Sequence, residues 1–274
     1  MEKNHVKRAL KRGKTAIGTM AIEVKSPGFA QLCAIAGFDF LFIDAEHGTY
    51  SLEEMANIIQ ICRKVGMVPL VRVQDLAYHL IAGVLDAGAM GVMVPRIRTA
   101  EQVEEMVSYI QYPPKGVRGG GGTGRSEFGL AYQGMSSGEK LEYLNQETLA
   151  IAQIERKEAI ENIDAIASVP GLDACVIGPY DLSISLGVPG EGNHPLMKDA
   201  IQKTIATCKK HGIASGGHMS AEALEYGWRH GMRMLTCNAD IGMLRKGCRD
   251  TVAQLKAFLG ETTSDVEDEM FVEE

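Results

Sequence analysis

Short apolar runs alternate with segments of helical periodicity along almost the whole chain, and this alternation limits the folds that the chain can adopt. Continuous runs rich in Val, Ile and Leu are typical of strands that are buried on both faces, as in a parallel sheet. Each run is followed by a segment long enough for the crossover helix that parallel strands require. The predicted strands lie near residues 16–20, 39–44, 68–73, 91–95, 149–155, 173–178, 213–217 and 233–238.

Start and stop signals mark the intervening helices. Ser51 and Glu54 have the spacing of an N-terminal capping box, and Gly66 and Gly88 stand where helices should end. Eight strands joined by helices predict a closed (β/α)8 barrel, with a doubly wound open sheet as the alternative. The predicted helices lie near 27–36, 51–65, 77–87, 99–110, 137–147, 157–168, 196–211 and 220–230, and a last helix lies near 240–259.

Length and charge favour one barrel domain followed by a tail. A chain of 274 residues with 45% hydrophobic content can bury one barrel core, since such barrels commonly contain about 250 residues. The formal charge of −7 comes from residues 261–274, which contain seven acids and no base, so the remaining 28 acids balance 28 bases. We therefore predict a barrel over residues 1–260, a disordered acidic tail over 261–274, and no nucleic-acid partner.

The six cysteines show no metal-binding or disulfide spacing, and no apolar stretch approaches the length of a membrane span. The basic start of the chain is better interpreted as an exposed first helix than as a transit peptide, because no apolar or cleavage-like segment follows it. These features predict a soluble, cytoplasmic protein with no membrane partner.

Acidic and basic side chains follow four of the predicted strands, where parallel barrels place their chemistry. FLFI leads into Asp44, Glu46 and His47, and MVPLV leads into Arg72. His47 is a candidate base, with a neighbouring carboxylate to orient its ring. Arg72 is a candidate ligand for a substrate carboxylate or enolate oxygen. The alternatives are a cluster that only solvates its own turn, and an ion pair between Arg72 and Asp44 or Glu46.

Glu155 and Asp181 are the candidate metal ligands, because two carboxylates at neighbouring strand ends suit Mg²⁺ or Mn²⁺ and leave positions for substrate. The alternative for Glu155 is an ion pair with the adjacent Arg156. Gln153 lies on the same side of its strand as Glu155 and would orient a ligand or water. The segment Gly178-Pro179-Tyr180-Asp181 predicts a turn into a short helix whose amides could bind a substrate carboxylate.

A long connection rich in glycine follows the fourth strand. Gly119–Gly122 lie beside Arg118 and Arg125, and long connections in compact domains are often functional. The segment lacks the ending of a nucleotide-binding loop. It is equally compatible with an anion-binding lid and a plain excursion; Arg118 is the better candidate for a substrate contact.

The chain resembles the HpcH/HpaI aldolases over residues 4–258. The resemblance rests on GFDFLFIDAEHG, PLVRV, VPRIRTAEQ, YPPKGVRG, AQIER, and IGPYDLSISLG followed by GNHP. It implies a barrel of the phosphoenolpyruvate/pyruvate-binding type, in a hexamer built as a trimer of dimers that exchange their last helices. It also implies a divalent metal (Mg²⁺, Mn²⁺ or Co²⁺), a 2-oxo acid and an aldehyde as small-molecule partners, and a lyase activity through a pyruvate enolate.

Individual site roles follow from the same resemblance. It implies Glu155 and Asp181 as metal ligands, His47 as the base with Asp44 as its partner, and Arg72 as the ligand of the keto oxygen. It also implies that Glu46 organises metal-bound water, that Gln153 neighbours the metal, and that the amides of Tyr180 and Asp181 hold the pyruvate carboxylate.

The chain departs from the family pattern at Tyr180, at Gly216-Gly217-His218 and at the end of the eighth strand. The family also includes a siderophore citrate synthase and macrophomate synthase. Condensation or decarboxylation of oxaloacetate-like acids at the same enolate site is therefore the alternative function. A non-catalytic anion-binding barrel would have lost part of the acid, base and arginine set, yet the whole set is present.

Overall fold

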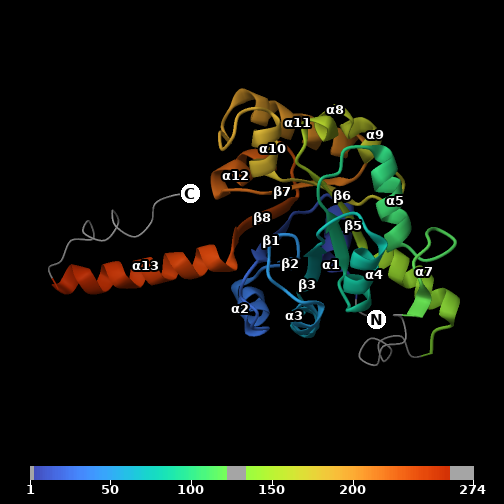
Figure 1. Cartoon of the computed structure of the whole chain (residues 1–274), viewed down its shortest axis with the longest axis horizontal. Coiled ribbons are helices and arrows are strands. Elements are labelled where there is room, and N and C mark those ends of the chain that lie inside the picture. The colour runs from blue at the N-terminus through green and yellow to red at the C-terminus, as the bar shows by residue number, and fades with distance from the viewer. Residues whose placement is uncertain (1–2, 122–133, 260–274) are drawn as a thin grey trace.

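The computed structural model describes residues 3–121 and 134–259 and shows a closed barrel of parallel strands (Figure 1). Each strand pairs with the next along the chain, and β1 pairs with β8 through Ala16↔Met234 and Ile17↔Leu235. This closure confirms the predicted (β/α)8 barrel and excludes the open sheet. The strands are β1 (Ala16–Ala21), β2 (Phe40–Asp44), β3 (Val68–Arg72), β4 (Gly91–Val94), β5 (Leu149–Ile154), β6 (Ala174–Ile177), β7 (Ala214–His218) and β8 (Met234–Ala239).

Most of the helices surround the barrel and begin where the sequence predicts. The capping boxes at Ser51 and Thr99 are both formed. The predicted helix over 157–168 is divided in two at Asn162. The helices are α1 (His5–Lys11), α2 (Gly28–Ala36), α3 (Leu52–Lys64), α4 (Tyr78–Asp86), α5 (Ala100–Ile110), α7 (Ser137–Glu147), α8 (Lys157–Glu161), α9 (Ile163–Ala167), α10 (Pro179–Ser185), α11 (Pro195–Lys210), α12 (Ala221–Arg229) and α13 (Asp240–Leu259).

The first helix is not the exposed helix that the basic sequence suggested. Val6 and Leu10 are buried in the core inside the barrel, and the Lys7 ammonium forms an ion pair with Asp173 at 2.8 Å. Lys7 also donates to the main-chain carbonyl of Thr148, just before β5. α1 therefore closes the end of the barrel at which the strands begin.

Two hydrophobic cores result from the alternation of side chains along each strand. One lies inside the barrel and includes Phe40, Phe42 and Leu70; the other lies between the strands and the helices and includes Leu41 and Ile43. Because side chains alternate between the two faces, residues two positions beyond an inner core residue also point inward. This rule places the polar residues at the strand ends inside the mouth of the barrel.

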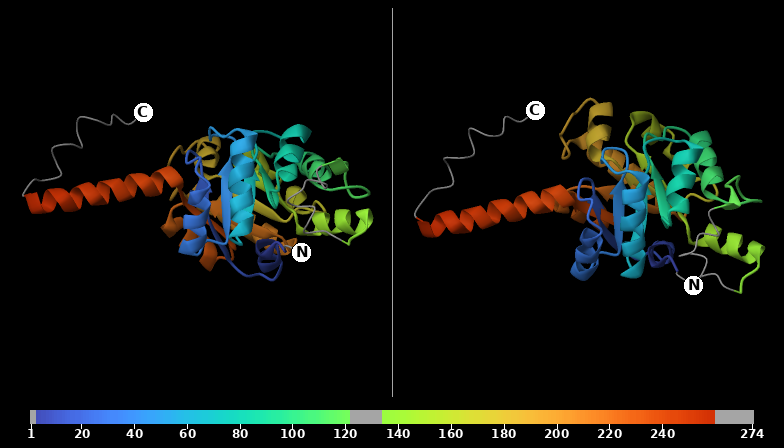
Figure 2. Two further views of the ribbon diagram at one scale, coloured as in Figure 1. Left: turned by 90° about the horizontal axis from the view of Figure 1, so that it is seen from below. Right: turned by 60° about the horizontal axis from the view of Figure 1, so that its bottom comes forward.

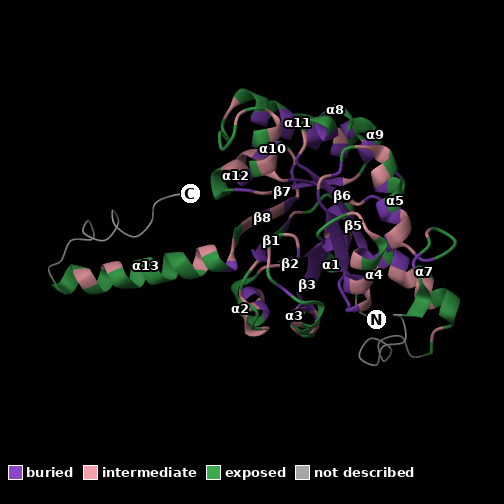
Figure 3. Ribbon diagram, viewed as in Figure 1, coloured by how far each residue is buried: buried purple, intermediate pink, exposed green. Residues whose placement is uncertain are grey.

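The last helix, α13, projects away from the barrel instead of covering it (Figures 1 and 2). Figure 3 shows that most of its surface is exposed or only partly buried. Asp240 is its one fully buried residue, and its carboxylate accepts hydrogen bonds from the main-chain N–H groups of Ile22, Glu23 and Val24. Asp240 thus fixes the point at which α13 leaves β8. No helix in the described ranges is both long and apolar enough to cross a membrane.

Candidate active site

The site is organised around a buried arginine on β3. Arg72 donates from Nε to Asp44 Oδ1 at 2.8 Å and from Nη2 to Asp44 Oδ2 at 2.6 Å. Its Nη1 lies 3.2 Å from Glu46 Oε2. Asp44 is completely buried and also accepts the main-chain N–H of Glu46 at 3.0 Å. The bidentate pair fixes the plane of the guanidinium, so the ion pair foreseen as an alternative for Arg72 is present.

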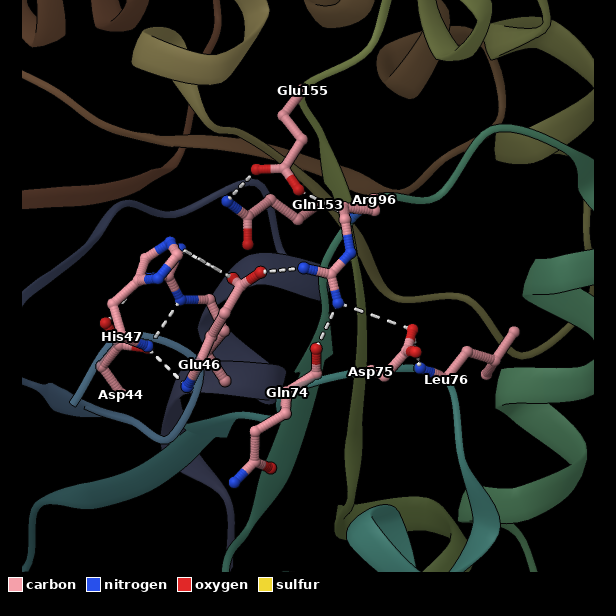
Figure 4. Close-up of polar contacts among 10 residues, drawn as sticks. Asp44, Glu46, His47, Gln74, Asp75, Leu76, Arg96, Gln153 and Glu155 are labelled. Carbon is pink, nitrogen blue, oxygen red and sulfur yellow. Dashed lines mark hydrogen bonds and ion pairs between the residues drawn. The ribbon is translucent and has the colours of Figure 1, made fainter. Parts of the chain in front are cut away.

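His47 lies beside a different carboxylate from the one that the sequence suggested. Its side chain is 62% exposed, and its Nε2 lies 4.0 Å from Glu46 Oε2 (Figure 4). Asp44 is directed instead to Arg72. Its only contact with His47 is a long hydrogen bond, at 3.4 Å, which the main-chain N–H of His47 donates to Asp44 Oδ1. The predicted pairing of Asp44 with the imidazole is therefore wrong, and Glu46 is its acidic neighbour.

The turn that follows His47 requires glycine. A Cβ atom on Gly48 would lie 2.1 Å from the main-chain oxygen of Asp44 and 2.7 Å from that of Ile22. Both contacts are with backbone, which cannot move aside as the end of a flexible side chain can. The close turn after β2 therefore holds Glu46 and His47 at the mouth of the barrel.

Arg96 also belongs to this network, which its sequence alone did not predict. Its Nη1 donates to Glu46 Oε1 at 2.7 Å, its Nη2 donates to the main-chain oxygen of Gln74, and its main-chain N–H donates to Glu155 Oε1 at 2.7 Å (Figure 4). Its φ of 57° is in the left-handed region, which is uncommon for a side-chain-bearing residue. The available signal was its place directly after the apolar run of β4, as Arg72 ends β3.

Glu155 is buried beyond the end of β5 and accepts hydrogen bonds at both oxygens. Gln153 Nε2 donates to its Oε2 at 2.6 Å, and the Arg96 amide donates to its Oε1, so these two groups take the place of the alternative ion pair with Arg156. Burial, and then the charges of Glu46 and Asp181, raise the pKa of Glu155 against the opposing effect of the Arg96 N–H. A Cβ on Gly178 would lie 2.7 Å from both Gln153 Nε2 and Glu155 Oε2, so glycine there makes room for the pair.

The predicted short helix after β6 is α10, with Gly178 as its N-cap and Pro179 in its first turn. Asp181 is partly buried in the first turn of α10, three residues beyond Gly178, whose backbone lies directly against the Glu155 carboxylate. Tyr180 is 70% exposed. The structure therefore brings carboxylates from the ends of β2, β5 and β6 around the mouth of one barrel.

The sequence pattern of the HpcH/HpaI aldolase/citrate lyase family matches residues 20–241. The chain belongs to this family. It is therefore an enzyme of a carbon–carbon lyase family, as the sequence motifs predicted. The strand-end residues described above all lie within the matched range.

Relatives in this family cover most of the chain. The 2-keto-3-deoxy-L-rhamnonate aldolase of Klebsiella pneumoniae subsp. pneumoniae is 37% identical over 215 residues, which are 78% of this chain and 78% of that protein. The hydroxypyruvate/pyruvate aldolase of Pseudomonas aeruginosa is 32% identical over 254 residues, which are 92% of this chain and 93% of that protein.

Solved structures share the same fold. An HpcH/HpaI aldolase from Desulfitobacterium hafniense DCB-2 has a TM-score of 0.84 and 32% identity, with 91% of this chain and 96% of that chain covered. A citrate synthase, SbnG, has a TM-score of 0.81 and 28% identity, with 93% and 98% covered.

The carboxylates of this HpcH/HpaI chain suit a hard divalent cation. Burial, and then the charges of Glu46 and Asp181, raise the pKa of Glu155, so its ionised form is costly in this place and a bound cation would relieve that cost. Within residues 3–121 and 134–259, no three His, Cys, Asp or Glu side chains form a complete metal centre. Two carboxylates with room for other oxygen ligands fit Mg²⁺ or Mn²⁺ better than a zinc site closed by protein ligands.

Arg118 does not join the site. Its guanidinium is 5% exposed, forms an ion pair with Asp86 at 2.8 Å and stacks over the Tyr112 ring at 4.5 Å. These contacts place it against α4 and the segment after α5, on the outside of the barrel. The prediction that Arg118 contacts the substrate is therefore wrong for the site of this chain. Residues 122–133 of the glycine-rich connection lie outside the described residues.

Proposed function

We propose that the protein is a metal-dependent aldolase that reversibly cleaves a 4-hydroxy-2-oxo acid to pyruvate and an aldehyde. The observation that carries this proposal is the buried Arg72 guanidinium, which Asp44 and Glu46 orient in the barrel mouth and which Glu46 and Arg96 link to the Glu155 carboxylate. A fixed donor beside a cation site is what an enolate oxygen requires. The names of the relatives support the reaction class.

Each side chain then has one task. Glu155 and Asp181 would hold the divalent cation, and the bound cation would supply Lewis-acid stabilisation of the developing negative charge. Arg72 has five N–H donors, three of which face Asp44 and Glu46. The remaining donors are available to the keto oxygen.

His47 moves the proton. It takes the C4 hydroxyl proton, the C3–C4 bond breaks, and the aldehyde leaves as the electron pair passes onto the keto-acid fragment, whose oxygen Arg72 stabilises. A proton returned to C3 gives pyruvate. Gln153 orients Glu155 by its 2.6 Å hydrogen bond, and the amides of Tyr180 and Asp181 would bind the substrate carboxylate.

The test is proton exchange into pyruvate in D₂O, followed by proton NMR. Loss of the methyl signal that requires Mg²⁺ or low Mn²⁺ and stops with EDTA would demonstrate enolate formation without any knowledge of the aldehyde. No exchange with any divalent ion would contradict the proposal. If exchange occurs but aldehydes are not accepted, oxaloacetate with product analysis tests the alternative, which the likeness to a citrate synthase supports.

His47→Gln should reduce aldol cleavage by about a hundredfold or more, because a positioned general base contributes 10² or more to the rate. The exposed imidazole lies next to Glu46 but outside the Arg72–Asp44 pair, so pyruvate binding should change little. Steady-state kinetics with a 4-hydroxy-2-oxo acid measure kcat and KM, and His79→Gln on the exposed surface of α4 is the matched control. A raised KM with unchanged kcat would remove His47 as the base.

We further propose that the enzyme is a homo-oligomer, a hexamer in which α13 is exchanged between partners. One face of α13 carries the exposed apolar side chains of Ile241, Leu244, Val252 and Leu255. The barrel correspondingly exposes a groove of about 570 Å³ beside β1, β8 and α12, which is lined by Thr15, Ile17, Ala221, Leu224, Glu225, Trp228, Leu235 and Cys237. Covering both apolar surfaces together would remove them from water.

Val252→Glu should therefore shift the assembly to smaller species, because it places a charge in the apolar face of α13. Ala257→Glu is the control, since Ala257 is exposed on the opposite side of the same helix. Sedimentation velocity measures the mass of both variants. Equal masses for Val252→Glu and wild type would contradict the exchange of α13.

A further inference from the structure

The wall formed by β7 and β8 carries two polar side chains into the barrel mouth. Ala214 and Met234 belong to the inner core, so the alternation of side chains also directs His218 and Thr236 inward. The two residues are register partners in the parallel pair. Adjacent strands are separated by about 4.8 Å, so their side chains lie side by side at one level of the barrel.

Glu155, the proposed metal ligand, lies at the same level of the barrel as His218 and Thr236. β5 and β6 pair through Ile154↔Ile177, and β6 and β7 pair through Ile177↔Gly217. One residue further along each strand are Glu155, Gly178 and His218. Gly178 contributes no side chain between them, so the β7–β8 wall and the Glu155 carboxylate face the same space.

Polar atoms on this wall have no partner within the described part of the chain. Thr236 is fully buried and its Oγ1 makes no hydrogen bond, and the same is true of the buried His218 Nδ1. Gln153 Oε1, one layer deeper on β5, is also unpaired. Unpaired buried polar atoms typically cost about 1–3 kcal/mol each, so three around one space indicate that a ligand group completes them.

The chemistry of these atoms selects a hydroxyl group. A hydroxyl donates one hydrogen bond and accepts others, which matches a threonine hydroxyl and a neutral imidazole. Burial, and then the charge of Arg72, lower the pKa of His218 against a smaller opposing effect of Asp44, which favours the neutral ring. A methyl group in the same place would leave all three polar atoms unpaired.

We propose that His218 and Thr236 form a subsite for a hydroxyl group on C3 of the keto acid, so that the enzyme selects 3-hydroxy-2-oxo acids over 2-oxo acids that end in a methyl group. The inference rests on the proposed function, because it takes Glu155 as the anchor of the keto acid. The keto acid is the source of the hydroxyl because Thr236 is 0% exposed and lies at the level of Glu155. The exposed His47 side chain marks the outer position, where the aldehyde would enter.

The test compares equilibrium binding of hydroxypyruvate and pyruvate, which differ by this one hydroxyl, to the Mg²⁺-loaded full chain by isothermal titration calorimetry. Wild type should bind hydroxypyruvate about tenfold more tightly, since one satisfied hydrogen bond is worth about 1–1.5 kcal/mol. His218→Leu and Thr236→Val should each reduce that ratio of Kd values by about five- to tenfold. His218→Asn and Thr236→Ser keep a polar atom in place, so these variants should retain most of the preference for hydroxypyruvate over pyruvate.

The ratio is the readout because a general weakening of the site affects both ligands equally. An unchanged ratio in both His218→Leu and Thr236→Val would overturn the subsite. It would also be overturned if these variants altered only the preference for glycolaldehyde over acetaldehyde, because the hydroxyl would then belong to the aldehyde. Failure of the proposed function is a separate result, seen as absent exchange of the pyruvate methyl protons in wild type.

Discussion

Glu155→Gln should reduce metal-dependent proton exchange into pyruvate by about a thousandfold, since Lewis-acid stabilisation by a bound cation supplies several kcal/mol and each 1.36 kcal/mol is a factor of ten. The substitution keeps the shape of the side chain and an oxygen that can accept the Arg96 N–H. It removes the charge that would hold the cation. NMR exchange rates measured over a range of Mg²⁺ concentrations would report the loss.

The same substitution should not destabilise the fold. Burial and the nearby carboxylates raise the pKa of Glu155. At a pH above the ordinary pKa of a glutamate, the ionised side chain therefore lowers the stability of the folded state. Glutamine removes that cost, and the melting temperature without metal should stay equal or rise at neutral pH. Glu158→Gln, on the exposed side of α8, controls for loss of a carboxylate. Undiminished exchange at saturating Mg²⁺ would remove Glu155 from the cation site.

The sequence was sufficient for the barrel and for most of the residues in its mouth, and the reason is periodicity. Once FLFI is a strand buried on both faces, Asp44 must follow Phe40 and Phe42 inward, and Arg72 must follow Leu70. The strand ends of a closed barrel then converge without further information. The direction of a side chain at a strand end is thus a local property.

Partnerships between these residues could not be predicted in the same way. Whether Asp44 faces His47 or Arg72 depends on the turn at Gly48 and on the β2–β3 register, which pairs Asp44 with Arg72. Arg96 reaches the site through a left-handed backbone conformation, which the local sequence does not predict. Arg118 lies in a glycine-rich, cationic segment, yet the position of Asp86 and Tyr112 turns its charge away from the site. Each of these outcomes depends on contacts between distant segments.

Arg72→Ala should cost the fold about 3–5 kcal/mol, because it leaves the Asp44 carboxylate buried without a counter-charge. Asp44 is 0% exposed and takes two N–H groups from Arg72, so one main-chain N–H at 3.0 Å and one at 3.4 Å would have to stabilise it alone. The free energy of unfolding from urea titration measures the loss. Arg229→Ala is the matched control, since Arg229 pairs with Glu225 on the surface with its side chain 66% exposed, and such pairs contribute about 0–1 kcal/mol.

Two companion variants separate the structural and catalytic parts of the Arg72 effect. Asp44→Asn/Arg72→Ala removes the stranded charge and should recover part of the lost stability, yet it should remain inactive in pyruvate exchange because no donor faces the keto oxygen. Arg72→Lys keeps the charge but not the planar pair of donors, so it should lose less stability than alanine and still lose about a hundredfold in exchange. If Arg72→Ala were no less stable than Arg229→Ala, Asp44 would not depend on Arg72 for its burial. If Arg72→Lys kept full exchange, the directed N–H groups would not be the feature that stabilises the enolate oxygen.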